Sequence, residues 1–282
     1  MLGGRDLQRQ EQGTWLGITK HGRLAVLTNF REEGVNQISA RSRGAIVNAF
    51  LTQPASGCGD TKAFVEQLVE GEGLNGIGGF SLVCGNIGQP LAVISNRTPN
   101  ADEITWILEQ PGETIGLSNS AIADRSWTKV TRGEQLMSSA IERHVATSNA
   151  KDFLIEDLFN ILSDDTLPRN HGGLKTASLE TYVTELRKSI FIPAVGGQGT
   201  YDLSAEDLAA AKSNQHVDVH ISKPPDGMHG KYGTQKQTII LVDQQGQVDF
   251  VERTLYDANG VPTISEKRDR SYEFRTEGWN SL

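Results

Sequence analysis

The sequence predicts an α+β protein built from antiparallel sheets and layers of paired helices. Strand-turn-strand patterns occur near the start, in the middle and near the end of the chain. Pairs of amphipathic helical patterns lie between them, so that helices follow strands in blocks. We expect one domain over residues 1–282 because no linker separates these blocks.

The first strand pair is predicted over residues 13–30. Apolar residues lead into a polar turn, Lys20-His21-Gly22, and out again to a strand that ends at Thr28-Asn29. Two amphipathic helices are predicted next, around residues 45–50 and 64–69, the second with a capping signal at Asp60-Thr61.

A second hairpin is predicted over residues 80–94, followed by a strand near 113–117 and by helices around 136–141 and 154–162. Gly and Pro interrupt residues 164–235 repeatedly, which indicates an elaborated loop region. The last hairpin is predicted over 238–251, with a closing strand at 272–274.

Composition excludes several function classes. The chain has 282 residues and a net charge of -8, whereas a nucleic-acid-binding face is normally basic and clustered. The densest basic spot, Arg41 with Arg43, suits a small phosphate-bearing ligand. No apolar run is long enough for a transmembrane segment, and the polar start is not a signal peptide.

The two cysteines, Cys58 and Cys84, form neither a disulfide framework nor a paired metal motif. A reducing compartment is therefore expected, either the cytosol or an organelle interior. Cys84 alternates with apolar residues and is predicted to lie in the core. Cys58 precedes a predicted helix and should be more accessible, but we do not expect it to be catalytic.

Three segments carry a family resemblance: residues 13–30, Ile115-Gly116-Leu117-Ser118-Asn119 and Tyr232-Gly233-Thr234. With these segments the chain resembles the Transport and Golgi organisation protein 2 family, also called the NRDE family. The resemblance implies a fold like that of N-terminal nucleophile hydrolases, an αββα sandwich of two stacked antiparallel sheets between helical layers.

In that family a Cys after the initiator Met and an Asn-Arg-Asp-Glu motif precede the first hairpin, and this sequence contains neither. We therefore expect the chain to lack the first strands of the family domain. An N-terminal nucleophile needs Cys, Ser or Thr at position one, which Met1-Leu2-Gly3 does not supply. Whether the protein is an enzyme stays open, but the chain as it stands is not expected to be catalytic.

Asn119 ends an apolar segment, where its amide could donate to an oxyanion during acyl transfer or simply form a turn. In the related choloylglycine hydrolase group a matching Asn helps form the oxyanion hole, and Asn29 matches a second donor. The resemblance thus implies that Asn29 and Asn119 face one pocket. The family usually has Arg after Tyr-Gly-Thr, but this chain has Gln235, followed by Lys236.

Other patterns are given simpler interpretations. Residues 71–76 match the letters of a dinucleotide fingerprint, but a helix precedes them and a strand follows, the reverse of the order required. His216, Asp218 and His220 share one strand face, which suits a metal ion or an axial haem ligand, but a solvated edge is expected. Arg97 is interpreted as a surface or pocket-rim cation.

The leading hypothesis is a protein that binds a hydrophobic or amphipathic small molecule, such as a lipid, acyl-CoA or haem, as cargo and without a required cofactor. The expected pocket comprises Asn29, Arg41, Arg43, Asn119 and the Gly233, Thr234, Gln235 and Lys236 segment. The resemblance implies a role in Golgi organisation, secretion or trafficking, in the cytoplasm or in association with the Golgi or mitochondria.

The alternative is an amidase or thioesterase whose nucleophilic Cys lies in a missing amino-terminal segment, with Asn29 and Asn119 as its oxyanion donors. A third hypothesis is a scaffold whose 164–235 region binds a protein partner.

Overall fold

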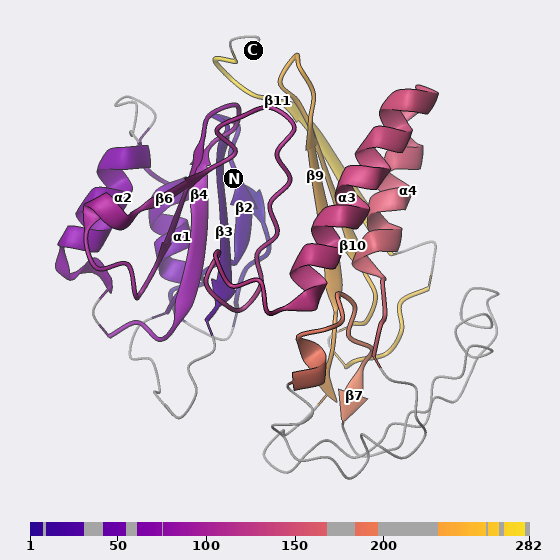
Figure 1. The fold of residues 1–282 in the computed structure, drawn as a ribbon, viewed down its shortest axis with the longest axis horizontal. Coiled ribbons are helices and arrows are strands. Elements are labelled where there is room, and N and C mark those ends of the chain that lie inside the picture. Colours follow the sequence, from indigo (N-terminus) through magenta and orange to yellow (C-terminus); the bar gives the residue numbers. More distant parts are fainter. Residues whose placement is uncertain are drawn as a thin grey trace. The chain divides into compact units, whose positions relative to one another are not determined.

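The computed structural model describes residues 1–7, 10–30, 42–54, 61–74, 76–167, 184–196, 231–257, 259–264 and 268–279. The chain forms two compact units. The first comprises Met1–Ser126, Val242–Val248 and Phe274–Leu282, and the second comprises Trp127–Leu241 and Asp249–Glu273. Both contain a helix-covered antiparallel sheet, which confirms the mixed α+β class (Figure 1).

The first unit contains a six-stranded sheet in which every neighbouring pair is antiparallel and the spatial order follows the sequence. The two predicted hairpins lie at its centre. Helices α1 (Gly44–Leu51) and α2 (Thr61–Glu70) confirm the first two predicted helices. The strands are β1 (Leu2–Gly3), β2 (Leu16–Ile18), β3 (Arg23–Asn29), β4 (Phe80–Asn86), β5 (Leu91–Ser95) and β6 (Thr105–Ile107).

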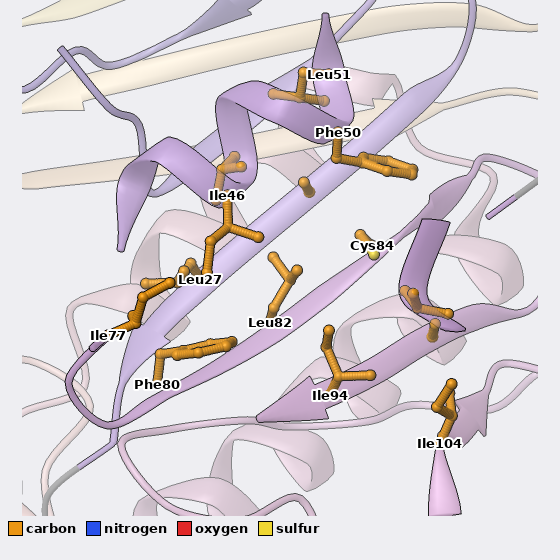
Figure 2. Close-up of a cluster of buried hydrophobic side chains, with 14 residues drawn as sticks. Leu27, Ile46, Phe50, Leu51, Ile77, Phe80, Leu82, Cys84, Ile94 and Ile104 are labelled. Carbon is orange, nitrogen blue, oxygen red and sulfur yellow. The ribbon is translucent and has the colours of Figure 1, made fainter. Parts of the chain in front are cut away.

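Alternate residues of β3, β4 and β5 form one face of this sheet and pack against α1 and α2. Leu27, Leu82 and Ile94 are direct neighbours across the three strands, and all are buried. Figure 2 shows them together with Ile46 and Phe50 of α1. Because side chains alternate along a strand, this core follows from the period-two pattern of the hairpins.

The strand predicted near residues 113–117 does not form. Residues 113–118 belong to no strand, and β6 lies earlier in the chain. The carbonyl groups of Ser118 and Ser120 accept hydrogen bonds from side-chain hydroxyls of Thr28 and Ser81, at 2.8 and 3.2 Å. These side-chain contacts hold the segment without the main-chain ladder of a strand.

The second unit contains two long helices and most of a three-stranded sheet of order β11-β10-β9, whose residues Val242, 247–248 and 274–275 are assigned to the first unit. The predicted helices and the last hairpin are confirmed. Helices α3 (Thr128–Thr147) and α4 (Lys151–Leu162) lie side by side. The strands are β9 (Lys236–Val242), β10 (Gln247–Thr254) and β11 (Asp269–Arg275), and a separate pair is formed by β7 (Val195–Gly196) and β8 (Lys231–Tyr232).

Helix α4 packs on β9 and β10 through a buried cluster that includes Leu158, Phe159, Ile239 and Val251. Two ion pairs join α4 to β10 on either side of Val251. Lys151 of α4 pairs with Asp249 of β10, and Glu156 of α4 pairs with Arg253 of β10. A reversed helix would bring like charges together, so the two pairs favour one orientation of α4 on the sheet.

The predicted loop region 164–235 is described only in part, over residues 164–167, 184–196 and 231–235. Ser189 is fully buried there, and its hydroxyl donates to the Phe191 carbonyl at 2.6 Å. It also accepts a hydrogen bond from the Thr166 amide at 3.0 Å. Each unit is thus defined internally, and the stacking of the two sheets into one sandwich stays a prediction.

Candidate functional site

Asn29 and Asn119 lie next to each other at one end of the first sheet. Asn29 is the last residue of β3, opposite Phe80 at the start of β4. The side-chain Nδ2 of Asn119 donates a hydrogen bond of 2.7 Å to the Asn29 main-chain carbonyl. The fold therefore brings together two candidate residues that are 90 positions apart in the sequence.

A row of hydroxyl side chains positions Asn119. Thr28, Ser81 and Ser95 are direct neighbours across β3, β4 and β5. Thr28 and Ser81 donate to the carbonyls on either side of Asn119, those of Ser118 and Ser120. Because these hydroxyls alternate with residues that face α1, the segment around Asn119 lies over the opposite face of the sheet.

Two arginines lie at the same end of the sheet. The Arg43 Nη1 atom, just before α1, donates to the Gly79 carbonyl at 3.1 Å, and this carbonyl also accepts from the Phe30 amide at 2.9 Å. The Arg97 guanidinium lies 4.4 Å from the centroid of the Phe30 ring. We call Asn29, Phe30, Arg43, Arg97 and Asn119 the polar sheet end.

The geometry defines what the Asn119 amide can do. A side-chain amide has two N–H donors, and one is directed at the Asn29 carbonyl. The second N–H remains to serve a ligand or a developing oxyanion. Asn29 contributes its main-chain carbonyl to this contact, so the hydrogen bond orients the Asn119 side chain. The oxyanion role of both residues stays a prediction.

The predicted Gly233 to Lys236 segment belongs to the second unit, where its residues make structural contacts. The Thr234 hydroxyl accepts from the Ile192 amide at 3.0 Å, and Gln235 Nε2 donates to the Asp257 carbonyl at 3.1 Å. Lys236 Nζ pairs with Glu252 at 2.6 Å. The substitution of Gln for the family's Arg thus leaves an amide that bridges to a neighbouring loop.

Gly233 is required by a close approach of two backbone segments. A Cβ atom there would lie 2.8 Å from the Ala194 Cα and 3.0 Å from the Pro193 carbonyl oxygen. Such distances are too short for carbon, so only glycine fits without movement of the backbone. A packing requirement therefore accounts for this glycine of the Tyr-Gly-Thr motif.

Cys84 is fully buried in β4, as the sequence predicts. Burial raises the pKa of its thiol to about 12, because the thiolate would lose its hydration. A thiol that stays protonated at neutral pH is a poor nucleophile. Cys84 is therefore a core residue.

Several sequence candidates lie outside the described residues: Arg41, Cys58, His216, Asp218 and His220. Within the described ranges, no group of three or more His, Cys, Asp or Glu residues is arranged to hold a metal ion. Residues 72–74 form a short 3₁₀ helix between α2 and β4, in agreement with the rejection of a dinucleotide fingerprint. Among the helices that the structure describes, none is both long and apolar enough to cross a bilayer.

Sequence reasoning missed the roles of Phe30, Thr28 and Ser81. The two hydroxyl residues become neighbours only through the register of β3 with β4. Their signal in the sequence is a single polar residue near the end of each apolar strand, which resembles an ordinary strand end. The interaction of Arg97 with Phe30 joins positions on different loops, and local patterns do not predict it.

These observations define a class: a mixed α+β protein with helix-covered antiparallel sheets and a polar site at one end of the larger sheet. The family model for Transport and Golgi organisation 2 matches residues 1–257. The chain belongs to this family.

Relatives in animals and yeast match nearly the whole chain. The human Transport and Golgi organization protein 2 homolog is 30% identical over 276 residues, which is 97% of this chain and 82% of the human protein. The bovine homolog is 29% identical over 279 residues, covering 98% and 83% of the two chains. An uncharacterized protein of Saccharomyces cerevisiae is 23% identical over 286 residues, covering 95% and 83%.

Proposed function

We propose that this protein binds a hydrophobic or amphipathic small molecule at the polar sheet end, in a pocket derived from a hydrolase site. The cargo is a lipid, an acyl-CoA or haem, and no cofactor is required. The names of its mammalian relatives connect them with transport and Golgi organization. By family membership we assign this chain a role in Golgi organisation, protein secretion or intracellular trafficking.

One observation carries the proposal: the Asn119 amide is oriented by the Asn29 carbonyl at the same sheet end where the half-buried Phe30 ring lies beside a guanidinium. An aromatic ring next to oriented polar donors is a surface that suits an amphipathic molecule, because each part of the ligand meets a matching group. A ligand with an apolar chain and a polar head fits this combination.

The proposal includes the αββα arrangement of the family. Both sheets have a second face that is also apolar, opposite the face covered by helices. On the first sheet this face carries Val26, Val83 and Val93, which are neighbours across three strands. On the second it carries Val248 and Phe250. Two apolar faces of this kind favour a stacked pair of sheets.

We place the protein in the cytoplasm, in association with the Golgi or with mitochondria. This assignment rests on the family and on the cysteine usage of the chain. Fractionation of source cells, with immunoblotting of cytosolic, Golgi and mitochondrial fractions, tests it. Recovery in the secreted fraction would contradict it.

Ligand binding is tested by titrating the purified chain with palmitoyl-CoA, below its micelle concentration, and separately with haem. We expect saturable binding that is weakened about 5- to 10-fold by Asn119→Ala, the scale of one lost hydrogen bond. Asn86→Ala is the matched control, because Asn86 lies at the opposite end of β4. Absence of saturable binding to both ligands, or equal effects of the two variants, would contradict the proposal.

A second candidate function is amide or thioester hydrolysis by a Cys in a segment that precedes this chain. The proximity of Asn119 to Asn29 favours it, because an oxyanion hole needs donors fixed in advance of the reaction. The test uses the native protein from source cells and a thioester substrate. A loss of about 100-fold in kcat for Asn119→Ala, with little change in KM, is expected if Asn119 donates to the oxyanion. An unchanged kcat would exclude that role.

A further inference from the structure

One cross-strand pair at the polar sheet end needs partners from outside the ladder. Asn29 of β3 lies opposite Phe80 of β4, and the next pair, Phe30 with Gly79, is joined by a main-chain hydrogen bond of 2.9 Å. Hydrogen-bonded and non-hydrogen-bonded pairs alternate in an antiparallel ladder, so Asn29 and Phe80 form a non-hydrogen-bonded pair. Their main-chain N–H and C=O groups therefore point away from each other and need other partners.

Asn96 supplies the partner of the Phe80 amide, which donates to the Asn96 Oδ1 atom at 3.3 Å. The pairing of β4 with β5 reaches Ser81 and Ser95, one position before Phe80 and Asn96. The Asn96 side chain thus continues this ladder by one step. On the other side of the pair, Asn119 Nδ2 donates to the last carbonyl of β3 at 2.7 Å.

The backbone of Asn96 is held by the turn that follows β5. The Ser95 amide donates to the Thr98 hydroxyl at 2.9 Å, and the Thr98 amide donates to the Ser95 carbonyl at 3.1 Å. Ser95 is itself paired with Ser81 of β4. A side chain that projects from such a constrained turn is a fixed support for the start of β4.

Loss of the Asn96 oxygen would disturb the whole pair. The Phe80 amide would lose this acceptor, and an unpaired amide at a partly buried position is unfavourable. The start of β4 should then move until water reaches the amide. Because Asn29 lies directly opposite, its carbonyl should move as well, and the Asn119 amide would lose the acceptor that orients it.

We infer that Asn96 is a positioning residue of the ligand site: it fixes the start of β4, and through the pair of Asn29 with Phe80 it holds the Asn119 amide toward the ligand. The inference rests on the proposed function and adds a residue that acts through Asn119 and need not touch the ligand.

The test measures how strongly Asn119→Ala weakens binding of palmitoyl-CoA or haem, whichever the wild type binds, in four backgrounds: wild type, Asn96→Ala, Asn96→Asp and Asn100→Ala. Asn96→Asp keeps a side-chain oxygen as acceptor for the Phe80 amide. Its added charge is present with and without Asn119→Ala and cancels in the comparison. Asn100 is the matched control, because its Oδ1 also accepts a main-chain amide, that of Asp102 at 3.0 Å.

We expect Asn119→Ala to weaken binding about 5- to 10-fold in the wild type and in the Asn96→Asp and Asn100→Ala backgrounds. In Asn96→Ala the loss should fall to about 2-fold or less, because the Asn119 amide is no longer oriented. Equal losses in Asn96→Ala and in the wild type would overturn the inference while the proposed function stands. A loss that falls equally in Asn96→Asp would also overturn it, because the acceptor for Phe80 would then not be the cause.

A second measurement needs no ligand. The side-chain amide signals of Asn119 in a nitrogen–proton correlation NMR spectrum are identified by their absence in Asn119→Ala. We expect them to shift in Asn96→Ala and to stay close to their wild-type positions in Asn96→Asp and Asn100→Ala. If the wild type binds neither ligand, the proposed function fails, and this spectrum alone decides the role of Asn96. A shift in Asn96→Ala would then support that role, and unchanged signals would overturn it.

Discussion

The Arg253 guanidinium lies 3.7 Å from the centroid of the Phe159 ring and is enclosed between two carboxylates. It donates to Glu156 of α4 at 2.6 Å and to Asp269 of β11 at 2.6 Å. The Arg253 side chain is only 8% exposed, while those of Glu156 and Asp269 are 60% and 38% exposed. One residue therefore ties a helix and two strands of the second unit together.

We expect Arg253→Gln to lower the free energy of unfolding by about 2–4 kcal/mol, because a buried cation network and its stacking on Phe159 are lost. Arg253→Lys should recover less than half of this loss, since lysine cannot bridge two carboxylates with a planar fork. Urea unfolding followed by circular dichroism measures both. Glu156→Gln is the control and should cost less than about 1 kcal/mol, because Glu156 is largely solvated.

The buried thiol of Cys84 should make the free energy of unfolding fall in alkaline solution. Burial raises its folded-state pKa to about 12, above the ordinary value of an exposed thiol. A raised folded pKa contributes stability that is complete below pH 9 and is lost as the pH rises toward 12. In that window the loss from this thiol should be about 1 kcal/mol per pH unit.

The test is to measure urea unfolding of the wild type and of Cys84→Ala at several pH values between 8 and 11. The midpoints can be compared if the m values stay constant. The variant is less stable at neutral pH because it leaves a small cavity, but its alkaline loss should be shallower. Other titrating groups are common to both proteins and cancel in the comparison. If stability falls equally with pH in both proteins, Cys84 does not stay protonated in the folded chain.

Alanine substitutions at two glycines of the second unit should change the stability of the protein in opposite directions. Gly233→Ala brings a Cβ to 2.8 Å from the Ala194 backbone and should destabilise by about 1–3 kcal/mol. Gly133 lies inside α3, where a new Cβ would meet only Ile190 at an ordinary 3.6 Å. Gly133→Ala should therefore stabilise by up to about 1 kcal/mol through helix propensity. Thermal unfolding of the two variants measures whether the melting temperature rises or falls. A change in the same direction for both variants would refute the packing argument.

The ion pair of Arg132 with Asp164 should contribute to stability at neutral pH, and this contribution should be lost in acid. Arg132 donates two hydrogen bonds to Asp164, at 2.5 and 2.7 Å, and this contact holds the pKa of the Asp164 carboxyl below its usual value. A lowered folded pKa contributes stability that is present above about pH 4 and is lost as the pH falls through the folded pKa. Arg132→Gln should remove this part of the acid dependence.

Unfolding midpoints at pH 6 and at about pH 3 should therefore differ less in Arg132→Gln than in the wild type. Arg5→Gln is a suitable control because Arg5 bonds the neutral amide of Gln12. An acid dependence that Arg132→Gln leaves unchanged would show that Asp164 does not titrate with folding.

Local sequence patterns predict most of the elements that form. Hairpins at β2–β3, β4–β5 and β9–β10 and the helices α1 to α4 follow from alternation, amphipathic spacing and turn residues, which act over a few positions. The burial of Cys84 follows from the same alternation. The strand expected near residues 113–117 is wrong because hydroxyls from distant strands hold the adjoining carbonyls, and no local pattern contains that information.

By itself, then, the sequence determined the α+β class, the hairpins and helices, and a family whose motifs include Asn119. Only the tertiary structure decided which groups meet. The hydrogen bond from Asn119 to Asn29 joins residues 90 positions apart, and the contact of Arg97 with Phe30 depends on the register of three strands. Such contacts form because packing of the core brings strand ends together. Each contact therefore depends on the register of the whole sheet, and the residues next to it in the sequence do not determine it.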